Sequence, residues 1–304
     1  MNKKRARHSV HAGTMLMASL AGVLALEIGC AESNLAVVSD SDGASTADAS
    51  EPLARGQSPT GITGKGSFVV RYLPPKSPKL REMAKVVKES ELLTDVLPDL
   101  NGNFSLEQDL PIVFRECRQE NAYYDPRKRQ VSICYEFVRY LAVGFAEVYA
   151  NDEDGDEALQ NAITFFLFHE IGHALIDIDN LPITGGSEAA ADEFAAFVLM
   201  SLGDDGKLIV LHAAVAFSRI VGKGDSLDDS TLGDEHLLGR QRALNLICLA
   251  YGASPEEKDI KDAALTIGMP PSRLARCAEE YDRISVSWLT LLQPHLKQTA
   301  AAGR

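Results

Sequence analysis

The sequence contains too little positive charge to suggest a nucleic-acid partner. Its 304 residues include 30 Lys and Arg against 43 Asp and Glu, which gives a formal net charge of −13 at pH 7. Because binding to nucleic acid requires a basic face, we expect no such partner. The hydrophobic content of 45% is ordinary, so the composition is that of a globular protein.

The apolar run near the N-terminus is not long enough to be a transmembrane helix. Residues 12–26 form a run of fifteen residues, which is too short to cross a bilayer as a stable helix but matches the apolar core of a secretory signal. The basic residues within 3–7 precede this run, as in a signal peptide. We therefore predict a signal peptide over residues 1–30 and export from a bacterial cell.

The end of this segment, residues 26–30, resembles a bacterial lipoprotein cleavage box, because a small residue precedes Cys30. Glu27 departs from that pattern, since an uncharged residue is usual at its position. Two alternatives stay open. Lipidation of Cys30 would give a periplasmic or outer-membrane lipoprotein whose only membrane contact is its anchor, and ordinary cleavage after Gly22 would give a secreted protein.

The rest of the chain divides by composition into a linker, a domain and a tail. Residues 31–64 are mostly Ser, Ala, Asp, Gly, Thr and Pro, which cannot bury enough apolar surface to offset the entropy of ordering, so we predict a disordered linker. Residues 65–297 are sufficient for one domain with a sizeable core. Residues 298–304 are expected to form a flexible tail.

The pattern of the domain changes from strands to helices along the chain. We predict strands over 68–73, 111–115 and 130–135, the last two forming a hairpin joined through 124–126. A helix is expected over 79–97, ended by Pro98, and the chain is expected to be helical after Phe137. The acidic run at 151–157 is typical of a solvated helix N-terminus. Strands followed by helices indicate an α+β fold.

The most informative stretch is Phe165–Leu175, which contains the pattern His-Glu-x-x-His within an apolar run of helical character. His169 and His173 are four residues apart and therefore share one helix face, where two imidazoles can bind one metal ion. A catalytic zinc ion needs three protein ligands and an open position for water, whose pKa it lowers to about 7. Glu170 is placed to accept the proton of that water. The sequence thus predicts a zinc hydrolase with one catalytic ion.

Two residues are candidates for the third zinc ligand. Asp179 has the spacing used by compact zincins, but those have a helix-ending glycine where this chain has Ile176. Glu188 follows a loop with two glycines and begins an Ala-rich helix, so a second helix can bring it across the first. We favour Glu188. Asp192 shares its face and is expected to orient a liganding histidine, whereas Glu193 is expected to be solvated.

The motif His-Glu-x-x-His followed by Glu-x-x-x-Asp resembles that of the gluzincin metallopeptidases. The chain is similar to a bacterial family of metallopeptidases without an assigned substrate, over blocks that cover most of residues 65–295: 68–75, 116–135, 169–196 and 234–252, the last with Gln241-Arg242. The resemblance implies a zincin-like fold with a small N-terminal sheet and a mainly helical part that carries the active-site helix. It also implies zinc bound by His169, His173 and Glu188, with Glu170 as the base.

Peptide hydrolysis requires a further group that stabilises the tetrahedral oxyanion. His236 is the first candidate, and Tyr123 and Tyr124, next to a predicted turn, are the second. An exported zinc-dependent peptidase acting on peptides or proteins is the function that the sequence favours. The alternative is an exported zinc-binding or partner-binding module that keeps the fold without turnover. The intact Glu170 favours the enzyme, since a module has no chemical need for a base there.

Five cysteines are present, and four lie within the predicted domain. An even number in an exported protein favours two disulfides. Cys117 and Cys134 flank the predicted hairpin, and Cys248 and Cys277 lie in two predicted C-terminal helices. Of the three possible connectivities, we therefore expect the local one, Cys117–Cys134 and Cys248–Cys277.

Overall fold

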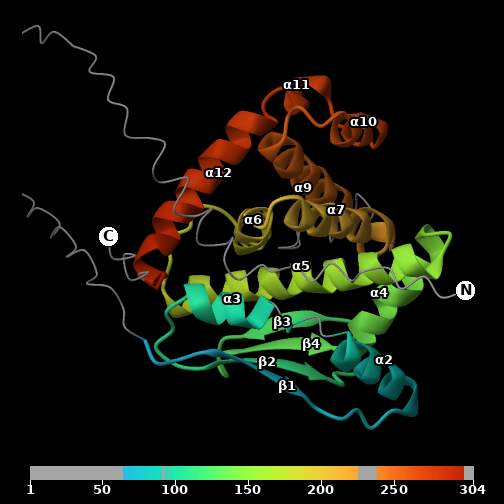
Figure 1. The fold of residues 1–304 in the computed structure, drawn as a ribbon, viewed down its shortest axis with the longest axis vertical. Coiled ribbons are helices and arrows are strands. Elements are labelled where there is room, and N and C mark those ends of the chain that lie inside the picture. The colour runs from blue at the N-terminus through green and yellow to red at the C-terminus, as the bar shows by residue number, and fades with distance from the viewer. Residues whose placement is uncertain (1–63, 91–92, 95, 225–237, 298–304) are drawn as a thin grey trace, which may run out of the picture.

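The computed structural model describes residues 64–90, 93–94, 96–224 and 238–297. The predicted signal peptide with Cys30, nearly all of the predicted linker, the predicted tail and His236 lie outside these residues. A small mixed sheet forms one layer and a group of helices the other, with the long helix α5 (Asp152–Ile178) lying between them (Figure 1). The predicted α+β class is confirmed.

The sheet has four strands in the order β1-β2-β4-β3. The strands are β1 (Phe68–Tyr72), β2 (Leu110–Arg115), β3 (Ala122–Asp125) and β4 (Gln130–Cys134). The first three in this spatial order pair in parallel, and β3 pairs antiparallel with β4 at the edge nearest α5. The sheet therefore presents a short antiparallel edge strand to α5.

The predicted hairpin between residues 111–115 and 130–135 is wrong. These segments are β2 and β4, and they pair in parallel, with Ile112 opposite Val131. Parallel neighbours need a longer connection, and here that connection contains β3. The true hairpin joins β3 to β4 through a turn in which the Lys128 N–H donates to the Asp125 carbonyl. Because β3 is half-buried along its whole length, it has no alternating pattern to mark it as a strand.

The helix expected over residues 79–97 is two helices, α2 (Pro78–Glu89) and α3 (Val96–Asn103). Pro98 does not end a helix but lies in the first turn of α3. Proline is tolerated there because first-turn N–H groups have no partner within the helix. The prediction failed because a proline that ends one helix and a proline that begins the next look alike in sequence.

The helical layer follows the sheet, as predicted. Its helices are α4 (Tyr135–Val148), α5, α6 (Ser187–Met200), α7 (Asp204–Arg219), α9 (Gly239–Ala253), α10 (Lys258–Thr266), α11 (Pro271–Leu274) and α12 (Cys277–Leu292), with short 3-10 turns η2 (Val221–Gly224) and η3 (Gln293–His295). None of the helices in the described ranges is long and apolar enough to cross a membrane. In Figure 1, α6, α7 and α9 lie over α5 on the side away from the sheet.

Helix α5 organises the core because it is covered on both sides. Its N-terminus is capped by Asn151, whose side chain accepts the Asp154 N–H at 2.9 Å, and acidic residues fill its first turn, as the sequence indicated. From Ala162 to Gly172 every residue of α5 is buried. The sheet covers one side of this segment and the helices α6 and α7 cover the other, so its polar side chains are held in fixed surroundings.

Both predicted disulfides are present. Cys117 is bonded to Cys134 beside the sheet, and Cys248 to Cys277 between α9 and α12. Each bridge closes a short segment of chain, of 17 and 29 residues in sequence separation. Loops of this size correspond to roughly 2–4 kcal/mol of stabilisation each, mainly through the entropy of the unfolded chain.

Candidate metal centre

The three predicted ligands come together at one point between α5 and α6. His169 and His173 lie one turn apart on α5, with their Nε2 atoms 3.1 Å from each other. Glu188, in the first turn of α6, directs Oε2 to the His169 Nε2 at 3.3 Å and Oε1 to the His173 Nε2 at 3.1 Å. One donor atom from each side chain lies within 4.8 Å of the other two, as a shared cation requires.

Glu188 reaches this point because α6 crosses α5 at very short range. Gly172 makes the crossing possible: a Cβ atom at this position would come within 2.9 Å of the Phe194 ring and 3.2 Å of the Ala191 backbone. The glycine of the motif therefore has a packing role between the two histidines. It lets the α6 backbone approach the face of α5 that carries them.

The donor set fits a zinc ion. Two imidazole nitrogens and one carboxylate are a common ligand set of catalytic zinc. Two donors on one tetrahedral zinc are roughly 3.3 Å apart, because each lies about 2.0–2.1 Å from the ion. The two Nε2 atoms are 3.1 Å apart, and each Glu188 oxygen lies near that distance from one of them, Oε1 at 3.1 Å from His173 and Oε2 at 3.3 Å from His169. These residues can hold zinc with little rearrangement.

Asp192, one turn after Glu188, fixes the orientation of His169. Its Oδ1 atom lies 2.9 Å from the His169 Nδ1. An ionised carboxylate can only accept, so the proton of a neutral His169 lies on Nδ1, which leaves the lone pair of Nε2 for a cation. Both side chains are buried. This is the arrangement expected of a group that sets the tautomer of a metal ligand.

Arg242, on α9, completes this arrangement and had no role assigned from the sequence. Its Nε donates to the Asp192 Oδ2 at 2.8 Å and its Nη2 to the Asp192 Oδ1 at 2.7 Å. The guanidinium also lies 4.0 Å from the centre of the Phe217 ring. Burial tends to raise the pKa of Asp192, but Arg242 and His169 hold it below its usual range, so the carboxylate stays ionised.

The charges of the site favour a bound cation. Although burial tends to lower it, hydrogen bonds to Asp192 and Glu188 raise the pKa of His169 to about 9. Burial tends to raise the pKa of Glu188, but His169 and His173 outweigh this effect and lower it. The two carboxylates therefore stabilise positive charge at the point between the imidazoles, whether it is carried by protons or by a metal ion.

Glu170 lies next to His169 but outside the ligand cluster. Its side chain is only 6% exposed, and burial raises the pKa of its carboxyl group. The nearby histidines and the backbone N–H of Tyr124, on β3, act in the opposite direction. A raised pKa makes the carboxylate a better proton acceptor near neutral pH, as a general base requires.

The three residues predicted as candidates to stabilise the oxyanion differ in where they lie. The Tyr124 hydroxyl donates to the Asp177 Oδ2 at 2.8 Å, so its proton is directed to α5. Burial and the neighbouring Asp177 raise the pKa of Tyr124. Tyr123 lines the same cavity as the metal cluster, and His236 lies outside the described residues. Tyr124 would have to leave Asp177 to contact a reacting group.

Asp179 is placed away from the cluster. Helix α5 does not end at Ile176 but continues to Ile178, and Asp179 follows as its C-terminal cap. The Asp179 Oδ2 lies 3.2 Å from the His295 Nδ1, in the C-terminal turn η3. The compact-zincin ligand set would require a sharp turn before Asp179, and the structure has none there.

The expectation that Glu193 is solvated is wrong. Its side chain is half-buried beside a cavity of about 40 Å³, where α6 faces α9 and α12. Burial, and then the charges of Asp192 and Glu280, raise the pKa of Glu193 to about 7. Glu193 is rotated away from the face of Glu188, as expected, but a further helical layer covers the face to which it turns.

The candidate ligands His169, His173 and Glu188 line a cavity of about 670 Å³. Glu120 to Tyr124 form one wall, which includes most of the edge strand β3. His169, Glu170, His173 and Glu188 lie on the wall formed by α5 and α6. A third group of side chains is apolar and consists of Phe137, Phe166, Phe217 and Val221. The cluster is thus accessible to a ligand of considerable size.

Residues 72–292 of the chain match the family DUF4344, which is described as "Putative metallopeptidase". No curated protein and no solved structure matches the chain. Because the match covers well over half of the sequence, the chain belongs to this family.

Proposed function

We propose that this member of the family is an exported zinc-dependent peptidase. The observation that carries the proposal is the convergence of His169, His173 and Glu188 beside the buried Glu170, at the base of a cavity bordered by an open sheet edge. Zinc bound by the three ligands supplies a Lewis acid and lowers the pKa of water to about 7. A binding protein would need the ligands but would not need Glu170.

In this proposal Glu170 moves the proton. Its carboxylate accepts a proton from the attacking water and later donates it to the nitrogen of the leaving amine. The raised pKa of Glu170 suits both steps, because a carboxylate of ordinary pKa would release rather than hold the proton. Asp192 and Arg242 hold His169 in one tautomer throughout, so the ligand does not compete for the same proton.

The edge strand β3 is the proposed binding site for the peptide backbone. The Cys134 N–H donates to the Asn121 carbonyl, and in an antiparallel pair the hydrogen-bonded positions alternate. Ala122 and Tyr124 therefore direct their peptide groups away from β4. The Tyr124 N–H is directed to the Glu170 carboxylate, so Ala122 and the Tyr124 carbonyl are the groups proposed to pair with a peptide. An extended peptide can pair with this edge, preferably antiparallel to β3, since antiparallel pairing is the more stable.

The apolar side of the cavity predicts a preference for one kind of residue. Phe137 lies in the first turn of α4, directly after β4, and hence beside the N-terminal end of β3. A peptide antiparallel to β3 reaches that end with its C-terminal half. The recess formed by Phe137, Phe166, Phe217 and Val221 would then take a bulky apolar side chain that follows the cleaved bond.

The proposal of export has independent support in the two disulfides, which are typical of oxidising compartments. A lipid anchor at Cys30 remains part of this proposal. Labelled palmitate should be incorporated by cells that express the full chain and not by the Cys30→Ser variant. Absence of label in both would leave a protein released by ordinary signal cleavage.

The experiment that tests the enzyme proposal is digestion of a peptide library by the zinc-loaded protein, with and without a chelator. We expect one zinc per chain, cleavage before bulky apolar residues, and loss of cleavage on chelation. Glu170→Gln should keep zinc and lower kcat by roughly 10²–10⁴-fold. Glu82→Gln, at an exposed position on α2, is the matched control.

Three results would contradict parts of the proposal. Absence of stoichiometric zinc would reject the metal centre. Stoichiometric zinc without cleavage of any library peptide would favour the binding module. Unchanged cleavage by Glu170→Gln would assign the proton transfer to another group.

A further inference from the structure

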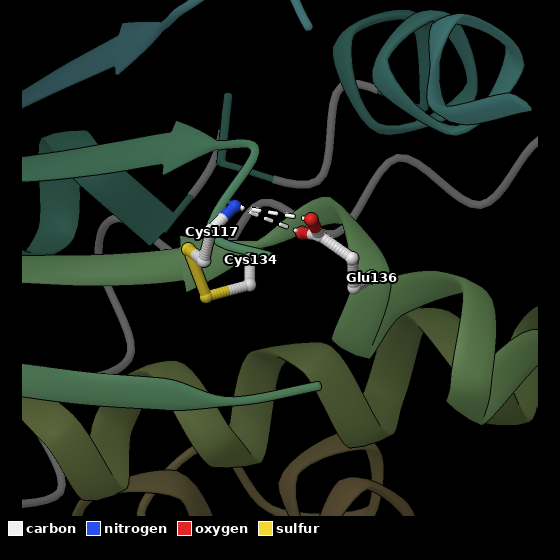
Figure 2. A group of neighbouring side chains, drawn as sticks. All are labelled: Cys117, Cys134 and Glu136. Carbon is white, nitrogen blue, oxygen red and sulfur yellow. Dashed lines mark hydrogen bonds between the residues drawn. A yellow bond between two sulfur atoms is a disulfide. The ribbon is translucent and has the colours of Figure 1, made fainter. Parts of the chain in front are cut away.

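The segment between β2 and β3 is fixed by a disulfide and by backbone N–H groups that donate to carboxylates. Cys117 is bonded to Cys134, and the Glu136 carboxylate accepts the Cys117 N–H at 3.0 Å (Figure 2). The same carboxylate accepts the Arg118 N–H at 2.6 Å. Arg118 has a positive φ of 65°, so two successive N–H groups converge on one anion. Glu116, just before this point, accepts the Ser77 N–H at 3.0 Å.

These contacts do not form a second metal site, although the side chains of Cys117, Cys134 and Glu136 lie close together. The two sulfur atoms are bonded to each other, and both Glu136 oxygens accept backbone N–H groups. Figure 2 shows the carboxylate turned to the backbone rather than to the sulfurs. The disulfide and Glu136 therefore fix the backbone at residues 117 and 118 and do not form a ligand site.

The chain that the disulfide and Glu136 fix is the proposed substrate-binding edge. Strand β3 lies entirely within the loop that the disulfide closes, and Glu120 and Asn121, which line the cavity, lie two and three residues after the anchored Arg118. β3 has four residues and, among the described strands, pairs with β4 alone. Tyr124 also holds the second half of β3 to α5, through its hydroxyl at Asp177 and its N–H at Glu170. The first half of so short an edge strand is weakly held by its own hydrogen bonds, so its position depends on how the chain before it is fixed.

We propose that the Cys117–Cys134 disulfide and Glu136 position β3 for peptide binding, so that reduction of this disulfide weakens peptide binding without release of the metal. This inference rests on the proposed function. The metal ligands lie on α5 and α6, outside the closed loop, so the two sites are separable. If the competent position of β3 falls to about a tenth of the population, the apparent affinity for peptide falls about tenfold.

Reduction is accessible from one side of the bridge, because Cys117 is half-buried whereas Cys134 is fully buried. A thiol pair in the compartment would supply two electrons and two protons and itself become a disulfide. For the test we choose a phosphine, because dithiols bind zinc. The phosphine breaks the S–S bond and becomes a phosphine oxide, and water provides its oxygen and the two thiol protons.

The experiment compares three forms of the zinc-loaded full chain: the wild type, C117A/C134A, and C248A/C277A as the matched control with the other bridge removed. With phosphine, KM should rise about tenfold in the wild type and in C248A/C277A, with kcat within twofold and zinc retained. C117A/C134A should have the raised KM from the start and should not respond. Glu136→Ala should raise KM more than Glu136→Gln, which keeps one acceptor oxygen.

Amide hydrogen exchange provides a readout that does not depend on turnover. Amides of residues 118–124 should exchange faster after phosphine treatment and in C117A/C134A, whereas amides near His169 should not. Equal protection in all forms, an unchanged KM, or loss of zinc from C117A/C134A would overturn the inference. If the oxidised wild type cleaves no peptide, the proposed function fails, and exchange at residues 118–124 still decides the positioning role. If C117A/C134A does not fold, phosphine-treated wild type takes its place.

Discussion

Replacing Glu193 by glutamine should make the stability of the domain less dependent on pH. Glu193 has an ordinary pKa of 4.5, which burial, together with the charges of Asp192 and Glu280, raises to about 7. The positive groups nearby are already engaged: Arg242 bonds to Asp192, and Arg273 bonds to Glu280 at 3.2 Å. The folded protein therefore holds the Glu193 proton more tightly than the unfolded chain does.

The sign and the size follow from this difference. Below pH 4.5 Glu193 is protonated in both states, so its raised pKa does not change the free energy of unfolding. As pH rises from 4.5 to 7 the free energy of unfolding falls, and above pH 7 the loss is constant. At 1.36 kcal/mol per pKa unit the cost is at most roughly 3 kcal/mol. Because Glu193 is partly exposed, solvent screens the charge, and we expect about 1–2 kcal/mol.

The assay is urea or thermal unfolding of wild type and Glu193→Gln between pH 4 and pH 8.5, with a chelator so that metal binding adds no pH dependence of its own. The variant should be more stable by about 1–2 kcal/mol at pH 8.5, or about 2–8 °C in Tm, and similar to wild type at pH 4. Glu82→Gln, at an exposed position, should show no such trend. A difference between Glu193→Gln and wild type that is the same at all pH values would refute the reasoning.

The remaining predictions concern the metal ligands and the second disulfide. Glu188→Ala should lower zinc affinity severely, whereas Asp179→Ala should leave it unchanged because Asp179 contacts His295. Competition with a chromophoric chelator measures the zinc affinity of both variants. If Asp179→Ala loses zinc and Glu188→Ala retains it, the proposed ligand set is wrong. Asp192→Asn should weaken zinc binding by roughly 10–100-fold in the same assay, the usual effect of losing the group that orients a ligand. C248A/C277A should lower the free energy of unfolding by roughly 2–4 kcal/mol in urea while zinc affinity stays within twofold, and an unchanged free energy would mean that this bridge adds no stability.

Those parts of the site that depend on local geometry could be predicted from the sequence. The spacing of His169 and His173 requires only that residues four apart share a helix face. The approach of Glu188 required one further assumption, that the loop with two glycines reverses the chain direction. Gly172, which permits the close crossing of α6, lies inside the motif itself. The pairing of the cysteines was likewise a local question.

The sheet shows where local patterns stop being sufficient. β3 has no alternation of polar and apolar residues, because side chains on both of its faces are half-buried. The parallel pairing of β2 with β4 joins segments that are separated by a whole additional strand. Neither feature can be recognised in a short window of sequence, since both depend on which distant segments pack against or pair with the strand.

Arg242 could not be assigned from the sequence for a related reason. It is fifty residues from Asp192, and nothing in the stretch around Gly239–Ala253 indicates that one of its polar residues turns to the interior. Yet the metal centre depends on it physically. A buried carboxylate without a partner would take up a proton, and a protonated Asp192 could not hold the Nδ1–H of His169 as an ionised one does. The bidentate contact with Arg242 keeps Asp192 ionised, and so determines which nitrogen of His169 is left for the proposed metal ion.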